Sequence, residues 1–100
     1  MIVIVGTLGI DPRHDEAFRS VIAEVVDASL REPECHLYNF AADVTEAGTY
    51  RIVEEWTSRE ALDRHIASAH YQHFRAQLKQ FGVHTRRVDQ YEVAEKTTLA

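Results

Sequence analysis

The sequence predicts an α+β domain in which two helical regions cover one face of a four-stranded antiparallel sheet. The chain has 100 residues, which is enough for one small domain. Four segments are rich in β-branched residues or alternate apolar with polar residues, and two others carry apolar residues at helical spacing. Their order is β-α-β-β-α-β, the order of the ferredoxin-like fold.

The first strand and the first helix have the clearest patterns. Residues 2–10 are mostly Ile, Val and Leu, which predicts a strand. Asp11 and Pro12 end this strand and suit the start of a helix over 13–31, because Asp caps helices and Pro is tolerated in their first turn. Glu32 ends the helix, since a residue before proline disfavours the helical conformation. The apolar stripe of the helix consists of Phe18, Val21, Ile22, Val25, Val26 and Ser29.

Two strands joined by a hairpin loop are predicted in the middle of the chain. The strands cover 35–42 and 50–56, and the loop covers 43–49. Side chains alternate between the two faces of a strand. The first of these strands is therefore expected to carry His36, Tyr38 and Phe40 on one face and Cys35, Leu37 and Asn39 on the other. The second carries on one face Tyr50, Ile52, Glu54 and Trp56.

The second helical region begins at a capping box, Thr57-Ser58-Arg59-Glu60. Its first helix is expected to place on one side Leu62, His65, Ile66 and Ala69. A further turn or helix runs to about residue 80, and its apolar stripe is Tyr71, Phe74, Leu78 and Phe81. Gly82 ends this region, as glycine commonly does. A final strand over 83–94 completes a single domain at 1–94, and residues 95–100 are expected to form a mobile tail.

The far face of the predicted sheet leads us to expect a homodimer. Both helical regions cover the same face, so the apolar side chains of the other face need a second cover. A domain of this size buries about 60–70% of the surface of its unfolded chain, so further burial would stabilise it. Two copies of the sheet packed face to face would provide that burial.

Composition and charge narrow the classes of function. The chain has 11 Lys and Arg against 16 Asp and Glu, a net charge of −5, so no nucleic-acid partner is expected. Gly6 and Gly9 lack the spacing of a phosphate-binding loop. The single cysteine, Cys35, excludes an intramolecular disulfide and a multi-cysteine metal site. No apolar run approaches the about 18 residues of a membrane span, and no signal peptide is recognisable, so a cytoplasmic protein without a membrane partner is expected.

Several short motifs follow one another in a specific order along most of the chain. They are Glu32-Pro33-Glu34-Cys35, Tyr38, Glu54-Glu55-Trp56-Thr57-Ser58 with Ala61-Leu62, and His65 followed by Ser68-Ala69-His70-Tyr71 and Phe74. Over about residues 2–94 the sequence resembles the antibiotic biosynthesis monooxygenase family. It departs at Glu34, where the family usually has glycine. The resemblance implies a dimeric α+β barrel, with a pocket between sheet and helices in each subunit.

The resemblance also implies a class of chemistry. The founding members of the family oxygenate polycyclic phenols with dioxygen and without metal, haem or flavin, and other members act on quinols. A quinol or polycyclic phenol and dioxygen are therefore the expected small-molecule partners, and no cofactor is expected. Relatives on the same scaffold isomerise or bind small metabolites, so a non-oxidative isomerase or a small aromatic metabolite-binding protein is the alternative.

The sequence can be compared with the residues typical of a haem-degrading branch of the family. That branch has a tryptophan at the position of His65, an iron-ligating histidine at the position of Arg75, and an asparagine on the first strand. Arginine cannot ligate iron, and residues 4–8 contain no asparagine. Haem breakdown is therefore not expected.

Oxygenation without a cofactor requires a base, because only the anion of a phenol or quinol passes an electron readily to dioxygen. It also requires a flat apolar slot and hydrogen-bond donors for the charge that develops. Among six histidines, His65 is the best candidate for the base, since it lies beside Leu62 and Ile66 on the buried side of its helix. The structural alternative is a histidine at the core edge that bonds Glu54 or a backbone carbonyl.

The other predicted catalytic residues are Glu54 and Trp56. A carboxylate on the apolar face of a central strand is costly unless it is paired, so Glu54 is expected to orient His65 or to pair with an arginine. Trp56 would supply an aromatic wall or an N–H donor, or only fill the core. The predicted substrate-binding residues, which core packing would explain as well, are Tyr38, His70, Tyr71 and Phe74.

The sequence gives less support to a metal site and to a nucleophilic cysteine. His70 and His73 have a helical ligand spacing, with Asp63 or His65 within two turns, but their predicted exposures differ and no metal site is expected. Cys35 is disfavoured as a nucleophile, because the charge of Glu34 beside it would raise the pKa of the thiol. A buried strand residue is the better interpretation of Cys35.

Overall fold

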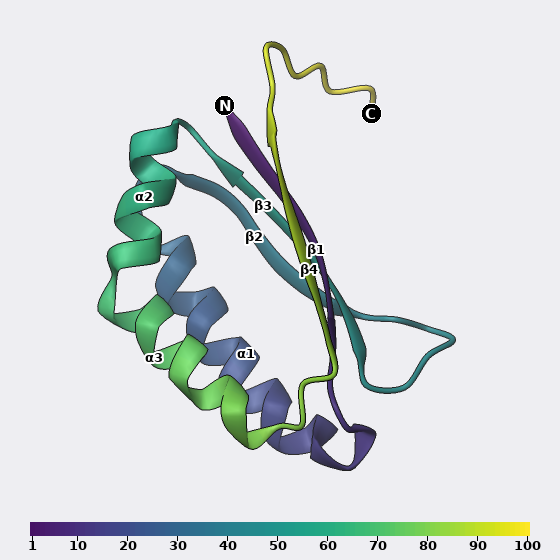
Figure 1. Ribbon diagram of the computed structural model, residues 1–100. Helices are drawn as coiled ribbons and strands as arrows, with labels where there is room; N and C mark the ends of the chain where they lie inside the picture. The colour runs from purple at the N-terminus through teal and green to yellow at the C-terminus, as the bar shows by residue number, and fades with distance from the viewer.

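The computed structural model describes residues 1–100 and has the predicted order of elements (Figure 1). The strands are β1 (Ile2–Gly9), β2 (Cys35–Ala42), β3 (Thr49–Trp56) and β4 (Thr85–Glu92). The helices are α1 (Asp15–Leu30), α2 (Arg59–Ala67) and α3 (Ala69–Gln77), with short 3-10 turns at Pro12–His14 and Leu78–Gln80. The ferredoxin-like fold predicted from the sequence is confirmed.

The four strands form one antiparallel sheet in the order β2-β3-β1-β4. All three helices lie on the same face of this sheet (Figure 1). In the register, Ile4 of β1 lies opposite Glu54 of β3 on one side and opposite Gln90 of β4 on the other. Paired residues of antiparallel strands point to the same face, so these three side chains lie side by side beneath the helices.

Helix α1 confirms the apolar stripe that was predicted for it. Phe18, Val21, Val25 and Ser29 are buried, and Ile22 and Val26 pack against the core at its edge. The α-helix begins after a 3-10 turn, which Asp11 caps by accepting the backbone N–H of Arg13 at 3.1 Å. None of the helices in the structure is long and apolar enough to cross a membrane.

The start of β2 departs from simple alternation. Cys35 lies opposite Trp56, but Leu37 lies opposite Glu55, so His36 is the extra residue of a β-bulge. The bulge turns both Cys35 and Tyr38 to the buried face and leaves His36 exposed. The prediction that Cys35 and Tyr38 face opposite sides is therefore wrong, because alternation fails wherever a strand carries an unpaired residue.

Helix α2 begins one residue later than the predicted capping box implies. Ser58, rather than Thr57, is the N-cap, and its hydroxyl accepts the backbone N–H of Ala61 at 3.1 Å. The helix ends at Ala67. Ile66, near its end, and Ala69, beyond it, are exposed, so the prediction that they share the buried side is wrong. The predicted stripe holds for Leu62 and His65, which are buried.

Ser68 forms the break between α2 and α3. Its hydroxyl donates to the backbone carbonyl of His65 at 2.6 Å and accepts the backbone N–H of Tyr71 at 3.3 Å. The same side chain therefore closes one helix and caps the next. As a result, His65 and His70 lie on two short helices whose relative direction Ser68 holds. Gly82, at φ 61°, closes the helical region as predicted.

No helix covers the outer face of the sheet (Figure 1). Val5 and Val53 lie opposite one another there, and Tyr91 of β4 lies on the same face. All three are substantially exposed in the single chain. The far face thus carries exposed apolar side chains, as the sequence predicted.

Candidate active site

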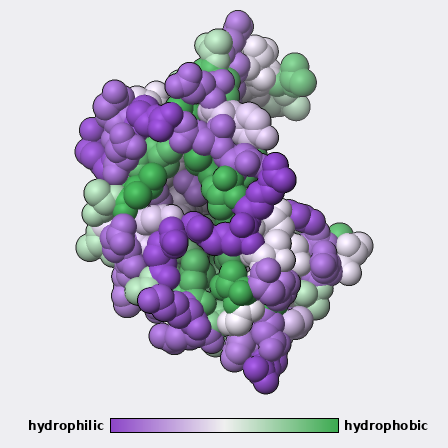
Figure 2. All heavy atoms as spheres, viewed as in Figure 1, coloured by the Kyte–Doolittle hydropathy of each residue, from purple (hydrophilic) through white to green (hydrophobic).

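Two neighbouring hollows lie between the helices and the inner face of the sheet. Figure 2 shows hydrophobic atoms inside two hollows, with hydrophilic groups around and between them. The larger, which we call the His65 cavity, has a volume of about 200 Å³. Its walls combine the polar side chains Glu54, His65, Tyr71 and Gln90 with the apolar side chains Ile4, Leu62, Ile66 and Val88.

The smaller hollow, of about 50 Å³, shares Glu54, Tyr71 and Val88 with the His65 cavity. Arg75 and Arg86 also line it, so its charged groups are one buried carboxyl group and two guanidinium groups. A groove of about 400 Å³ between α1 and β2 is larger than either hollow, but its walls include no histidine and no carboxylate. Of these three hollows, only the His65 cavity is lined by both a histidine and a carboxyl group.

His65 is the central group of this cavity. Only 1% of its side chain is exposed, and aromatic rings surround it, with centroids at 4.5 Å for Trp56, 4.9 Å for Tyr71 and 5.2 Å for Tyr38. Its Nδ1 atom lies 2.7 Å from Oε2 of Glu32, whereas its Nε2 atom is buried and has no hydrogen-bond partner. Burial lowers the pKa of His65, although the nearby Glu32 carboxylate opposes this effect.

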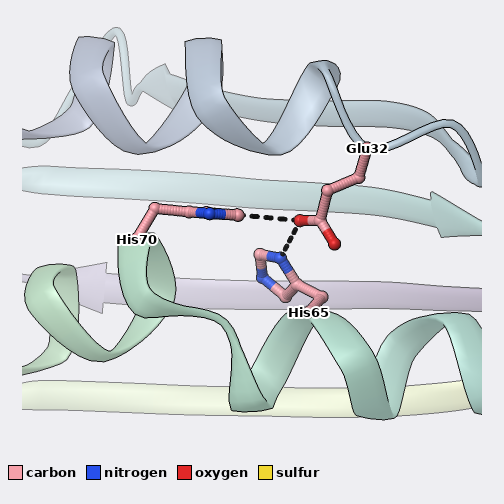
Figure 3. A group of neighbouring side chains, drawn as sticks. All are labelled: Glu32, His65 and His70. Atoms are coloured by element: carbon pink, nitrogen blue, oxygen red, sulfur yellow. Dashed lines mark hydrogen bonds and ion pairs between the residues drawn. The ribbon is translucent and has the colours of Figure 1, made fainter.

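The hydrogen bond to Glu32 determines which ring nitrogen of His65 is free. A carboxylate accepts a hydrogen bond, so Nδ1 carries the proton of the neutral ring and Nε2 is left as an acceptor. The same Oε2 atom of Glu32 lies 2.8 Å from Nε2 of His70 (Figure 3). One carboxylate thus joins two histidines, one buried and one half-buried.

The prediction that Glu54 orients His65 is wrong, because Glu32 occupies that position. Glu54 instead accepts the indole N–H of Trp56 at 2.9 Å. Only 8% of Glu54 is exposed, and this burial raises the pKa of its carboxyl group to about 7. The Trp56 donor opposes the shift, and the charge of Glu32 adds to it. A group with this pKa can hold or release a proton near neutral pH.

The other predicted site residues divide into two groups. Tyr71 lines both hollows, and Tyr38 and Phe74 line the smaller one. Trp56 is fully buried behind the His65 ring and forms no wall, so its contribution is the hydrogen bond to Glu54. His70, predicted to bind substrate, does not line either hollow, since its ring turns towards Glu32.

Several residues of the site were missed by sequence reasoning. The sequence marks Glu32 only as the end of a helix, although Glu32 belongs to one of the motifs that carry the family resemblance. Arg75, Arg86 and Gln90 have no distinguishing spacing in the sequence. The register of β4 against β1 brings Arg86 and Gln90 to the inner face, and only strand pairing establishes that register.

The metal arrangement considered from the sequence does not form. His73 is not part of this cluster, and its Nε2 atom lies 3.8 Å from Glu24 of α1. The group that could hold a metal ion is instead Glu32, His65 and His70, whose ligand atoms lie within 4.8 Å of one another. Cys35 is buried, and burial raises the pKa of its thiol to about 11, so it is not a ready nucleophile.

Comparison with known proteins agrees with the fold and the motifs. Residues 1–77 match the family model described as antibiotic biosynthesis monooxygenase. The chain is 30% identical over 80 residues to the Bacillus subtilis (strain 168) protein named "Putative monooxygenase YcnE", which covers 80% of this chain and 84% of that protein.

Solved structures show the same likeness. A Deinococcus radiodurans structure described as a "putative antibiotic biosynthesis monooxygenase" matches with a TM-score of 0.91 and 25% identity, covering 100% of this chain and 99% of that one. A structure from Caulobacter crescentus with the same description matches at a TM-score of 0.87 and 23% identity, covering 94% and 90%. The chain belongs to the antibiotic biosynthesis monooxygenase family.

Proposed function

We propose that this protein is a cofactor-independent monooxygenase that oxidises a quinol or related phenol with dioxygen, and that His65 is the base. One observation carries the proposal. The Nε2 atom of His65 is buried at a cavity wall without a partner, while Glu32 holds the Nδ1 atom. A hydroxyl group of a bound substrate would supply the missing hydrogen bond to Nε2 and is the proton donor that such a base requires.

Glu32 supports the proton transfer through the ring. When Nε2 takes a proton from the substrate, His65 becomes a cation in a buried place, which is costly unless a negative charge lies close. The Glu32 carboxylate at 2.7 Å supplies that charge, and His70 keeps the carboxylate in position. Glu32 and His70 are therefore positioning residues, whereas His65 touches the substrate.

The overall reaction balances without an added reductant. The quinolate passes one electron to dioxygen, and the two radicals combine to form a carbon–oxygen bond. The resulting peroxide breaks its O–O bond. One oxygen atom stays on the ring as a carbonyl or hydroxyl oxygen, and the other leaves as water with two hydrogens from the substrate. The substrate supplies all the electrons, so the protein has only to bind, orient and deprotonate it.

Glu54 and the size of the cavity bear on the substrate. With a pKa raised to about 7, the Glu54 carboxyl group can donate its proton to the second oxygen of a quinol. An apolar cavity of about 150 Å³ holds one benzene ring, so the 200 Å³ of the His65 cavity favours a single-ring quinol over a larger polycyclic phenol. Tyr71 would stack on this ring, with Tyr38 and Phe74 beyond it.

The test is dioxygen consumption by metal-stripped protein. We expect uptake above the autoxidation blank with single-ring hydroquinones, less with naphthohydroquinones, and least with anthrones. Product analysis with isotopically labelled dioxygen should place one labelled oxygen in the product and one in water. Binding of the quinols without dioxygen uptake or rearrangement would contradict an enzymatic function and favour a metabolite-binding protein. Rearrangement of the quinol without dioxygen uptake would favour an isomerase.

We also propose that the chain forms a homodimer through the outer face of its sheet. Val53 lies at the middle of that face, opposite Val5 and beside Asn39. Replacing Val53 by aspartate places a charge in the interface, so Val53→Asp is expected to convert a dimer into a monomer in light scattering coupled to size exclusion. The control is Val44→Asp, because Val44 is fully exposed in the hairpin loop. A monomeric wild-type protein, or a dimeric Val53→Asp variant, would rule out this interface.

A further inference from the structure

We propose that Glu32, His65 and His70 form a binding site for a divalent transition-metal ion, and their donor atoms favour Zn²⁺. The site lies beside the His65 cavity, and a bound ion changes the tautomer of His65. Metal binding itself is independent of the proposed reaction. Its effect on catalysis rests on the proposed function, and the two are tested separately below.

The donor set selects the class of ion. Two imidazole nitrogens and one carboxylate oxygen are available, and their atoms lie within 4.8 Å of one another. Imidazole donors favour Zn²⁺ and its neighbours Co²⁺, Ni²⁺ and Cu²⁺, whereas Mg²⁺ and Ca²⁺ prefer sites made of oxygen atoms. Two histidines and a glutamate with a water in the fourth position is a known ligand set for Zn²⁺.

The three side chains converge from separate parts of the fold (Figure 3). His65 comes from α2 and His70 from the first turn of α3, while Glu32 follows α1. Ser68 holds the two helices in their relative direction through hydrogen bonds to both. The surrounding aromatic rings fix the ring plane of His65. The fold therefore brings the three ligand-bearing side chains together before an ion arrives.

Binding of an ion requires the ligand atoms to move. The ring nitrogens of His65 and His70, which are separated by up to 4.8 Å, must approach one another, and the carboxylate oxygen of Glu32 must withdraw. In a tetrahedral site with bonds of about 2.0–2.1 Å, ligand atoms stand about 3.3 Å apart. The carboxylate oxygen of Glu32 now lies 2.7 Å from His65 and 2.8 Å from His70, so it must withdraw by about half an ångström. Glu32 lies in the turn after α1, and its side chain is 20% exposed, which leaves it room to move.

Solvent can reach the site from the side of His70. The side chain of His70 is 26% exposed, whereas that of His65 is 1% exposed. An ion can therefore enter between Glu32 and His70 and keep a water ligand on the open side. The buried ring of His65 then separates the ion from the cavity.

Metal binding would reverse the tautomer of His65. Without the ion, Glu32 holds a proton on Nδ1 and leaves Nε2 as an acceptor. An ion on Nδ1 displaces that proton, so the neutral ring must carry its proton on Nε2. His65 then presents an N–H donor at Nε2 to the cavity instead of a base. We infer that the ion inhibits the proposed oxygenation.

The experiment titrates metal-stripped protein with Zn²⁺ in competition with a chromogenic chelator, and with Co²⁺ while recording its visible absorption. We expect wild-type protein to bind one tight ion per chain and to give the strong visible bands of four-coordinate Co²⁺. His70→Ala and Glu32→Gln should each weaken Zn²⁺ binding at least about tenfold and remove those bands. Thermal melting of each variant establishes that it is folded.

The matched control is His73→Ala. His73 lies on the same helix as His70 and also stands near a glutamate, Glu24, at 3.8 Å, but has no second histidine. This variant should bind Zn²⁺ like the wild type. Equal losses in His70→Ala and His73→Ala would mean binding by surface histidines, and absence of tight binding in the wild type would overturn the site.

A separate assay addresses the effect on catalysis. Zn²⁺ should inhibit dioxygen uptake by the wild type, and His70→Ala should require at least about tenfold more Zn²⁺ for the same inhibition. Tight binding without inhibition would overturn the tautomer argument and leave the site. Tight binding in a protein that consumes no dioxygen would leave the site and count against the proposed function.

Discussion

His65→Gln is expected to lower kcat/KM for quinol oxidation by about 10²–10⁴-fold, the usual contribution of a general base. Glutamine can still donate to Glu32 through its amide group, so the packing and the hydrogen bond at 2.7 Å have a replacement. It cannot take a proton from the substrate. The measurement is the initial rate of dioxygen uptake with the best quinol of the panel, corrected for autoxidation.

His73→Ala serves as the control here as well, because His73 is exposed on α3 and lies away from the cavity. It should retain the wild-type rate. The loss in His65→Gln should persist in His65→Ala, provided that melting curves show both proteins folded. A folded His65→Gln protein with the wild-type rate would remove His65 as the base and move attention to Glu54, the other buried proton carrier of the cavity.

Glu54→Gln is expected to stabilise the protein at about pH 8, by up to about 3 kcal/mol, and to have little effect at about pH 4. The carboxyl group of Glu54 has its pKa raised from 4.5 to about 7 by burial. Between these values the unfolded chain ionises first, so the wild type loses stability as the pH rises and reaches its full loss above about 7. Glutamine cannot ionise and avoids that loss.

Urea unfolding of both proteins across this range measures the difference in the free energy of unfolding. The amide oxygen of glutamine can still accept the indole N–H of Trp56, so the hydrogen bond at 2.9 Å has a replacement. The control is Glu55→Gln. Glu55 lies on the outer face of the same strand, and its carboxylate pairs with Lys96 at 3.1 Å. A difference for Glu54→Gln that stays constant with pH would contradict the raised pKa.

The helices and strands follow from local patterns in the sequence. The apolar residues from Phe18 to Ser29 recur at helical spacing on one face, and this face of α1 packs against the sheet. The alternation from Tyr50 to Trp56 places Glu54 on the inner face. These features depend on the spacing of apolar residues along the chain, so they are visible before any tertiary contact is known.

Two local features could not be read in the same way. The bulge at His36 depends on how β2 pairs with β3, and the residues of β2 alone continue to alternate. The break at Ser68 depends on a hydroxyl group that bonds both helices, at a position where the sequence permits a longer helix. Each is decided by hydrogen bonds to residues outside the strand or helix whose pattern was considered.

The site shows the same division. The sequence by itself singled out His65, Glu54 and Tyr71, which all line the His65 cavity, and its short motifs indicated the family to which the chain belongs. A histidine and a glutamate on apolar faces are recognisable because they interrupt the apolar pattern. Only the tertiary structure paired His65 with Glu32, which lies 33 residues away, and brought His70 to the same carboxylate. A hydrogen bond between residues this far apart in the sequence depends on where the end of α1 meets the junction of α2 and α3. That meeting point is determined by packing of the helices on the sheet, which the spacing of residues along the chain does not encode.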